Sequence, residues 1–175
     1  YFINIAAGGR ITELTYEVPS KMKTMLGQLA YYLKAVEMAP SIKATHMRIE
    51  YDDNVFEGEA LMFLCALTNS VGGFEKLAPD ASINDGHFTL LILKKCSLAE
   101  MLKIVSDAVR GEHLENPNII YVKAKRVKVE SDETVHINLD GEYGGDAPVV
   151  FDNLYRHLDV FVSLKDIRDE DRIDM

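Results

Sequence analysis

Two acidic turns carry the residues whose types and spacing could do chemistry. The first is the stretch 78–88, APDASINDGHF, in which Asp85 lies between residues whose carbonyl groups could converge. A carboxylate combined with several carbonyl oxygens suits a hard cation such as Mg²⁺. A turn built on Asn-Asp-Gly with a solvated acid explains the same residues. From spacing alone we favour the plain turn over the metal site.

The second acidic turn is the stretch 138–143, NLDGEY. Its Asp-Gly pair favours a tight hairpin, which would place Glu142 just past the bend at the rim of a sheet. A glutamate there could act as a general base and take a proton from a hydroxyl that attacks phosphorus. A hairpin with surface acids is the alternative, and on these residues alone it is the preferred interpretation.

Other residue patterns point to no further chemistry. A phosphate-binding loop needs glycines at a helix start, and none of the three glycine pairs meets this well, so we interpret them as turns and points of close packing. The five histidines have no metal-binding spacing. Cys65 and Cys96 lie in apolar stretches, and we interpret them as reduced core residues of a cytosolic protein. The glycine pairs are Gly8-Gly9, Gly72-Gly73 and Gly144-Gly145.

Length and charge limit the class of protein. The chain has 175 residues, which fits one domain with a continuous core. It carries 28 acidic and 19 basic residues, for a formal net charge of −9. This balance disfavours a nucleic-acid partner, because phosphate binding requires a basic surface. No apolar run approaches the length of about 18 residues that a membrane span requires.

One group of basic residues runs against the overall charge. It falls within a predicted strand, and we interpret it as a solvated strand edge. Contact with a membrane or a partner protein is the less favoured alternative. The group consists of Lys123, Lys125, Arg126 and Lys128.

Two helical segments must lie beside the sheet that carries these turns. The first runs from a Ser20 cap to Pro40, with apolar residues at helical spacing between them. The second opens with Ser97 and Glu100 at capping-box spacing and ends at Gly111, where a helix would terminate. We expect both helices to pack against strands.

The rest of the chain predicts short strands separated by turns. Near Lys125-Arg126 the alternation of one strand shifts phase, which suggests a bulge. The fold class is therefore mainly β (α+β), a β-sandwich with two main helices packed against it. We expect one domain over 1–165 and a charged tail over 166–175. The predicted strands are 1–5, 45–51, 55–67 (a strand or a bent pair), 88–93, 120–129, 135–139, 149–151 and 160–164.

Together these segments resemble the bacterial soluble diacylglycerol kinases, a family grouped with sphingosine and ceramide kinases and, more distantly, with NAD kinases. The resemblance runs from YFINIAAGG at 1–9 through LGQLAYY at 26–32 to the region 146–162. APDA leading into Asp85-Gly86 is specific to the diacylglycerol kinase group. LDGE at 139–142 is shared more widely among lipid kinases.

The resemblance implies roles for the residues of both turns. It assigns the family's catalytic glutamate to Glu142. It assigns a structural Mg²⁺ site to the carboxylate of Asp85 with the backbone carbonyl oxygens of Ser82 and His87, and it adds Asp80 to a network that couples this ion to the active site. His87 stands where the family often has an aromatic residue, a change that a carbonyl ligand tolerates.

The resemblance also implies what lies outside this chain. The family's α/β domain, with a Gly-Gly-Asp-Gly-type loop for ATP, does not occur in these residues. The chain begins at Tyr1 in an apolar stretch, so we expect it to be an excised second domain with the nucleotide-binding half upstream. The full-length protein would convert diacylglycerol and ATP to phosphatidic acid and ADP, with a catalytic Mg²⁺ on the ATP, whereas this piece alone should be inactive.

Two other functions remain open from the sequence. One is a related lipid kinase that acts on a sphingoid base, ceramide or another lipid alcohol. The other is a non-catalytic β-sandwich that binds lipid or a partner protein. The resemblance further implies a cytoplasmic protein in peripheral, reversible contact with the inner face of the membrane, and a homodimer would suit the family.

Overall fold

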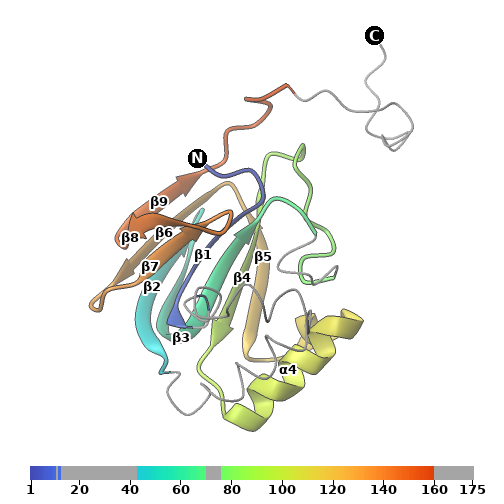
Figure 1. Ribbon diagram of the computed structural model, residues 1–175, viewed down its shortest axis with the longest axis vertical. Coiled ribbons are helices and arrows are strands. Elements are labelled where there is room, and N and C mark those ends of the chain that lie inside the picture. The colour runs from blue at the N-terminus through green and yellow to red at the C-terminus, as the bar shows by residue number, and fades with distance from the viewer. Residues whose placement is uncertain (11, 13–42, 70–75, 160–175) are drawn as a thin grey trace, which may run out of the picture.

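The computed structural model describes residues 1–10, 12, 43–69 and 76–159. This part of the chain folds mainly as β-structure, with nine strands, one α-helix and one short 3₁₀ helix (Figure 1). The elements are β1 (Ile5–Gly8), β2 (Thr45–Tyr51), β3 (Asn54–Ala66), β4 (Phe88–Lys94), α4 (Leu98–Arg110), η2 (His113–Glu115), β5 (Ile119–Ala124), β6 (Arg126–Ser131), β7 (His136–Leu139), β8 (Glu142–Asp146) and β9 (Val149–Asp152).

The strands form one antiparallel sheet that folds back on itself. Its main path runs β8-β7-β1-β3-β2-β6-β9, and β4 and β5 extend from β3 as a branch. The long strand β3 makes this branching possible, because Asn54–Ala60 pair with β2 whereas Phe63–Ala66 pair with both β1 and β4. The register shifts between Ala60 and Met62, and the stretch 55–67 forms one strand with an irregularity rather than a bent pair of strands.

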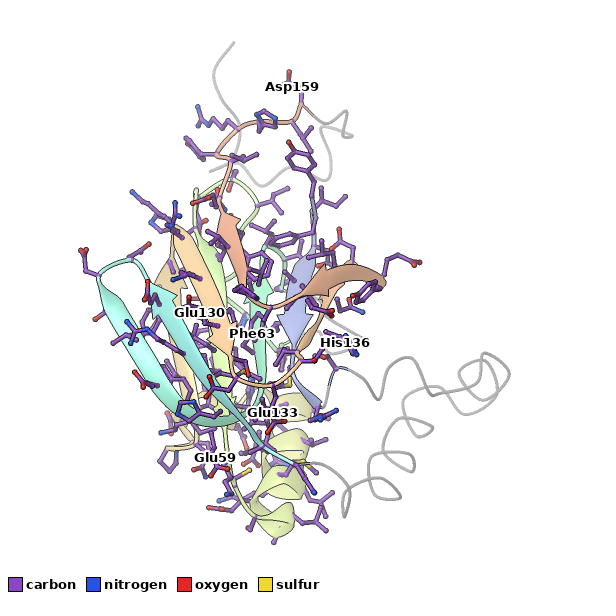
Figure 2. All side chains as sticks on the ribbon, turned by 90° about the vertical axis from the view of Figure 1, so that its left-hand side faces the viewer. Glu59, Phe63, Glu130, Glu133, His136 and Asp159 are labelled. Carbon is purple, nitrogen blue, oxygen red and sulfur yellow. The ribbon has the colours of Figure 1, made fainter. Side chains whose placement is uncertain are left out.

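Alternation along the strands separates two apolar layers. Phe63 and Cys65 of β3 point into the interior of the folded sheet, whereas Leu64 and Ala66 face outward towards α4. Figure 2 shows Phe63 in the interior, while Glu59, Glu130 and Glu133 lie at the surface. Neither cysteine forms a disulfide, and burial strongly raises the pKa of the Cys65 thiol, as expected for a reduced core residue.

The helix α4 follows its predicted bounds because both of its caps are local. Ser97 Oγ accepts the backbone N–H of Glu100, and the Glu100 carboxylate accepts the N–H of Ser97, both at 3.2 Å. Gly111 ends the helix with φ at 80°, in the left-handed region. The predicted helix over 20–40, the strand over 160–164 and the tail over 166–175 lie outside the described residues.

Three strand predictions need correction. The first strand begins at Ile5 rather than Tyr1, because the N–H groups of Ile3 and Asn4 bond a side chain instead of a neighbouring strand. The sequence analysis also missed β8, since Gly144 and Gly145 lie within it and glycine weakens a strand pattern. The stretch 120–129, predicted as one strand with a bulge, divides instead into the two strands β5 and β6 at Lys125, where the predicted phase shift lies.

Candidate active site

The predicted turn before Glu142 is a tight β-hairpin. Asp140 and Gly141 both have positive φ, 51° and 101°, the arrangement of a type I′ turn that matches the twist of the strands it joins. The side chain of Asn138 accepts the Gly141 N–H at 2.8 Å and braces the bend. Leu139 pairs with Glu142 across it.

Glu142 is the first residue of β8 and is exposed. Within the described part of the chain, no hydrogen bond or ion pair occupies its carboxylate. The side chain is thus open to solvent at the rim of the sheet. The hairpin and the place of Glu142 just past its bend are as predicted, and its catalytic role stays a prediction.

The predicted metal ligands lie in the loop before β4. Asp85 Oδ1 accepts the His87 N–H at 2.9 Å, and the ring Nδ1 of His87 donates to the Asp85 carbonyl at 2.8 Å. Ser82 Oγ donates to Asn84 Oδ1 at 2.6 Å. These bonds close the loop locally but do not involve the carbonyl oxygens of Ser82 and His87, so the Mg²⁺ site stays a prediction.

Strand β5 contributes two side chains that the sequence analysis did not assign to this loop. Lys123 Nζ donates to Asp85 Oδ2 at 2.9 Å and to the Asp80 carbonyl at 2.6 Å. The Tyr121 hydroxyl donates to Asp80 Oδ1. Burial and this contact with Asp80 raise the pKa of Tyr121, so its hydroxyl stays protonated and remains a donor. Positions 121 and 123 share one face of a strand, which is the signal that could have found them.

Gly86 lets another segment cover the same loop. Its φ is 73°, and a Cβ at this position would lie 3.1 Å from the ring of Tyr155, which follows β9. A larger residue would therefore meet both backbone strain and the ring. The loop is held from two sides, by β5 and by the segment after β9.

The register of the sheet brings the loop and the hairpin to the same end of the fold. Strands β1 and β4 both run antiparallel to β3, so they start at one end. Strand β7 is antiparallel to β1 and ends there, and β8 starts there. Figure 1 shows the segment before β1, the loop before β4 and the segment after β9 at this end, at the top. Four inter-strand steps along the curved sheet lead from β8 to β4.

Ion pairs neutralise most of the basic group on β5 and β6. Lys123 pairs with Asp85, Arg126 with Asp152 at 3.0 Å, and Lys128 with Glu130 at 2.8 Å. Little unpaired positive charge is left to attract an anionic surface. These contacts favour the predicted strand-edge interpretation of this group.

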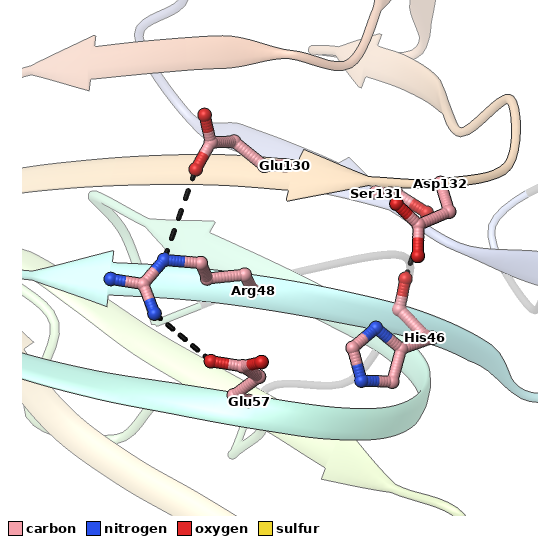
Figure 3. A pocket seen from close by; sticks show the side chains of 6 residues that line it. All are labelled: His46, Arg48, Glu57, Glu130, Ser131 and Asp132. Carbon is pink, nitrogen blue, oxygen red and sulfur yellow. Dashed lines mark hydrogen bonds and ion pairs between the residues drawn. The ribbon is translucent and has the colours of Figure 1, made fainter.

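A hollow of about 350 Å³ lies away from both turns, over β2, β3 and β6. At its centre, Arg48 donates to Glu57 at 2.9 Å and lies 3.9 Å from Glu130 (Figure 3). Its hydrogen bonds to Glu50 and Glu57 raise the pKa of the guanidinium. Carboxylates already surround the only arginine of the hollow, so its charge is not free to bind an anion. We therefore interpret the hollow as an ion-pair cluster between strands rather than a phosphate site. The hollow is lined by His46, Arg48, Glu57, Glu130, Ser131 and Asp132.

Among the described residues, no three histidine, cysteine or acidic side chains gather as metal ligands. The predicted Mg²⁺ site uses one carboxylate with backbone carbonyls, which is a different kind of site. No helix in residues 1–10, 12, 43–69 and 76–159 is long and apolar enough to cross a membrane.

A family model and named relatives both match most of this chain. Residues 11–162 match the family model described as the YegS C-terminal NAD kinase beta sandwich-like domain. A protein of Bacillus subtilis (strain 168) named diacylglycerol kinase is 64% identical over 160 residues, which are 91% of this chain and 53% of that protein. A diacylglycerol kinase of Staphylococcus aureus (strain Newman) is 54% identical over 173 residues, 99% of this chain and 55% of that protein.

The chain thus spans about half the length of the curated relatives that it matches. Among solved structures, a crystal structure of a diacylglycerol kinase from Bacillus anthracis str. Sterne superposes with a TM-score of 0.62 at 23% identity. The match covers 88% of this chain and 51% of that one. At this identity the structural likeness supports the fold alone.

Proposed function

This chain belongs to the family of YegS C-terminal domains with an NAD kinase-like β-sandwich, and from this premise we propose that it is the second domain of an ATP-dependent diacylglycerol kinase. The observation that carries the proposal is the exposed Glu142 immediately after a left-handed Asp-Gly turn. The proteins that match most of this chain at 64% and 54% identity are named diacylglycerol kinases.

In the proposed reaction Glu142 acts as general base. Its carboxylate takes the proton of the primary hydroxyl of diacylglycerol while the hydroxyl oxygen attacks the γ-phosphorus of ATP. A new P–O bond forms, the bond to the β-phosphate oxygen breaks, and phosphatidic acid and ADP leave. Glu142 then releases its proton to solvent. ATP and its catalytic Mg²⁺ would be bound by an upstream domain, since this chain contains no glycine-rich phosphate loop.

The loop before β4 would hold the structural Mg²⁺. The donors are hard oxygens, from the Asp85 carboxylate and the carbonyl groups of Ser82 and His87, which are the ligands that Mg²⁺ prefers. The loop already holds a positive charge, because Lys123 lies 2.9 Å from Asp85 Oδ2. Bound Mg²⁺ would supply a charge that rigidifies the loop.

The remaining features of the whole protein follow from its proposed substrate. Diacylglycerol resides in a bilayer, so we propose a cytoplasmic enzyme in peripheral, reversible contact with the inner face of the membrane. We also propose a homodimer, as would suit the family. Isolated from its nucleotide-binding half, this chain should transfer no phosphate.

The test is Glu142→Gln in the whole protein that carries this chain, with Glu133→Gln as the matched control. Glu133 is an exposed glutamate that precedes β7. Loss of a general base costs about 10²- to 10⁴-fold in turnover, so Glu142→Gln should abolish phosphatidic acid production while melting like the wild type. The control should keep full activity. Near-normal turnover by Glu142→Gln would remove Glu142 from the mechanism.

The acceptor is tested separately by assaying the wild type against diacylglycerol, ceramide and a sphingoid base. Preferred phosphorylation of diacylglycerol supports the proposal. Preference for another lipid alcohol would keep the reaction and replace the substrate. Absence of turnover with every acceptor in the presence of ATP and Mg²⁺ would favour a non-catalytic binding domain.

A further inference from the structure

One carboxylate at the tip of the Glu142 hairpin collects three backbone N–H groups from a distant part of the chain. Asp140 Oδ2 accepts the N–H of Ile3 at 2.7 Å. Asp140 Oδ1 accepts the N–H groups of Asn4 at 3.0 Å and Ile5 at 2.7 Å. These partners are more than 130 positions away in the sequence, so the contact links two elements that local structure does not join.

The backbone of the same residue completes the link. The Asp140 N–H donates to the Ile5 carbonyl at 3.0 Å, next to the pairing of Ala6 with Leu139 between β1 and β7. The bend itself is braced by the bond between Asn138 and Gly141. Little freedom is left to the tip of the hairpin, and Glu142 follows two residues after the anchored aspartate.

We propose that Asp140 is a positioning residue for Glu142. Its carboxylate anchors the hairpin tip to the segment 3–5 and thereby fixes where the general base stands relative to the nucleotide. Charge-assisted bonds to three N–H groups are roughly twice as strong as neutral ones, so the anchor resists movement of the tip. This inference rests on the proposed function, since it assigns a role toward the reaction of Glu142.

A second aspartate, Asp52, makes the same kind of backbone contact away from Glu142 and therefore serves as a control for a purely structural role. Asp52, in the turn between β2 and β3, also has a left-handed φ of 48°. Its carboxylate accepts the N–H groups of Lys125 and Arg126 at 3.0 Å each. Asp52 thus anchors a turn by the same chemistry, but its partners lie at the junction of β5 and β6 rather than at the hairpin of Glu142.

The variants are Asp140→Asn, Asp140→Gly and, as the matched control, Asp52→Asn, all in the whole protein. Asparagine is among the residues that adopt left-handed backbone most readily, so Asp140→Asn keeps the turn and weakens only the acceptor. Glycine fits the same backbone and removes the acceptor completely. The two substitutions therefore test the carboxylate without adding strain at the turn.

Hydrogen exchange and kinetics give independent readouts. We expect the amides of Ile3, Asn4 and Ile5 to exchange faster in both Asp140 variants, and to be unchanged in Asp52→Asn. We expect the kcat to fall by about 10- to 100-fold, the scale expected for a misplaced catalytic group, with the KM for ATP within twofold of wild type. Asp52→Asn should keep the wild-type kcat.

A double variant asks whether Asp140 acts through Glu142. If it does, adding Asp140→Asn to Glu142→Gln should cause no further loss of residual activity. An equal loss in both backgrounds would overturn the positioning role, and so would a kcat within twofold of wild type for a folded Asp140→Gly. Unchanged exchange at Ile3–Ile5 would overturn the anchor itself. An inactive wild type would instead overturn the proposed function together with the positioning role, and exchange would still decide the anchor.

Discussion

We predict that Lys123 and a divalent cation compete for the carboxylate of Asp85. Lys123 Nζ lies 2.9 Å from Asp85 Oδ2, whereas Asp85 Oδ1 is engaged by the N–H of His87 within the loop. A cation that binds Asp85 must therefore displace the ammonium group or share Oδ2 with it. Replacing Lys123 by methionine keeps the length of the side chain and removes its charge.

The size of the effect follows from the exposure of the pair. The side chains of Lys123 and Asp85 are 31% and 32% exposed, so water screens them and the ion pair contributes about 1 kcal/mol, the upper end for surface pairs. Lys123→Met should thus lower the free energy of unfolding by about 1 kcal/mol without Mg²⁺. It should also raise the affinity for Mg²⁺ about fivefold, the factor equivalent to about 1 kcal/mol.

The assay is thermal unfolding in EDTA and across a series of Mg²⁺ concentrations. A ligand that binds only the folded state raises its stability as the ligand concentration exceeds the Kd, so the Mg²⁺-induced shift should begin at lower concentration in Lys123→Met. Lys128→Met is the matched control, since Lys128 pairs with Glu130 and not with the loop. It should respond to Mg²⁺ as the wild type does.

Two results would refute this reasoning. A Mg²⁺ response in Lys123→Met that begins at the wild-type concentration or higher would show that lysine and cation do not compete. A full Mg²⁺ response in Asp85→Asn would show that the cation binds elsewhere. The second result would remove the proposed metal site and leave the assignment of Glu142 untouched.

Two further predictions concern the stability of α4 and its surroundings. Burial lowers the pKa of His113 in the folded chain below its usual 6.5, so the unfolded chain binds a proton at this residue more readily. The contribution of His113 to the free energy of unfolding should therefore be complete above pH 6.5 and fall as the pH drops below that value. His113→Gln should flatten this pH dependence, which is measured as the urea midpoint of unfolding at a series of pH values. A decline of the midpoint as steep as in the wild type would assign the effect to other groups. Ser97→Ala removes half of the capping box and should cost about 1 kcal/mol, seen as a melting temperature lower by about 2–4 °C; an unchanged melting temperature would contradict the role of the cap.

The sequence predicts those parts of the fold that depend on neighbouring residues. The helix Leu98–Arg110 has its capping box and its terminal glycine within the same short stretch, so its bounds could be predicted closely. The hairpin before Glu142 is likewise local, because an Asp-Gly pair favours one turn type. The strand β8 was missed for a local reason as well, since its two glycines resemble a turn.

Contacts between distant segments could not be predicted in this way. The order of strands in the sheet depends on pairings such as Ala6 with both Cys65 and Leu139, which no local pattern encodes. The ion pair of Lys123 with Asp85 joins residues 38 positions apart, and the sequence analysis placed that lysine in a basic cluster instead. The resemblance supplied Glu142 and the metal ligands, but not the side chains that hold them in place.

Asp52 and Asp140 both use a side-chain carboxylate to hold a distant backbone segment in place. A carboxylate has two oxygens that together accept several N–H groups. A single aspartate in a left-handed turn can therefore bind the backbone N–H groups of a neighbouring segment that lies before a strand or between two strands. Asp52 does this for Lys125 and Arg126 between β5 and β6, and Asp140 does it for residues 3–5 before β1. Each donor would otherwise lack a strand partner at that position. The exposed Glu142 differs from both, since no backbone group of the described chain engages its carboxylate, which leaves that carboxylate free for the base role proposed above.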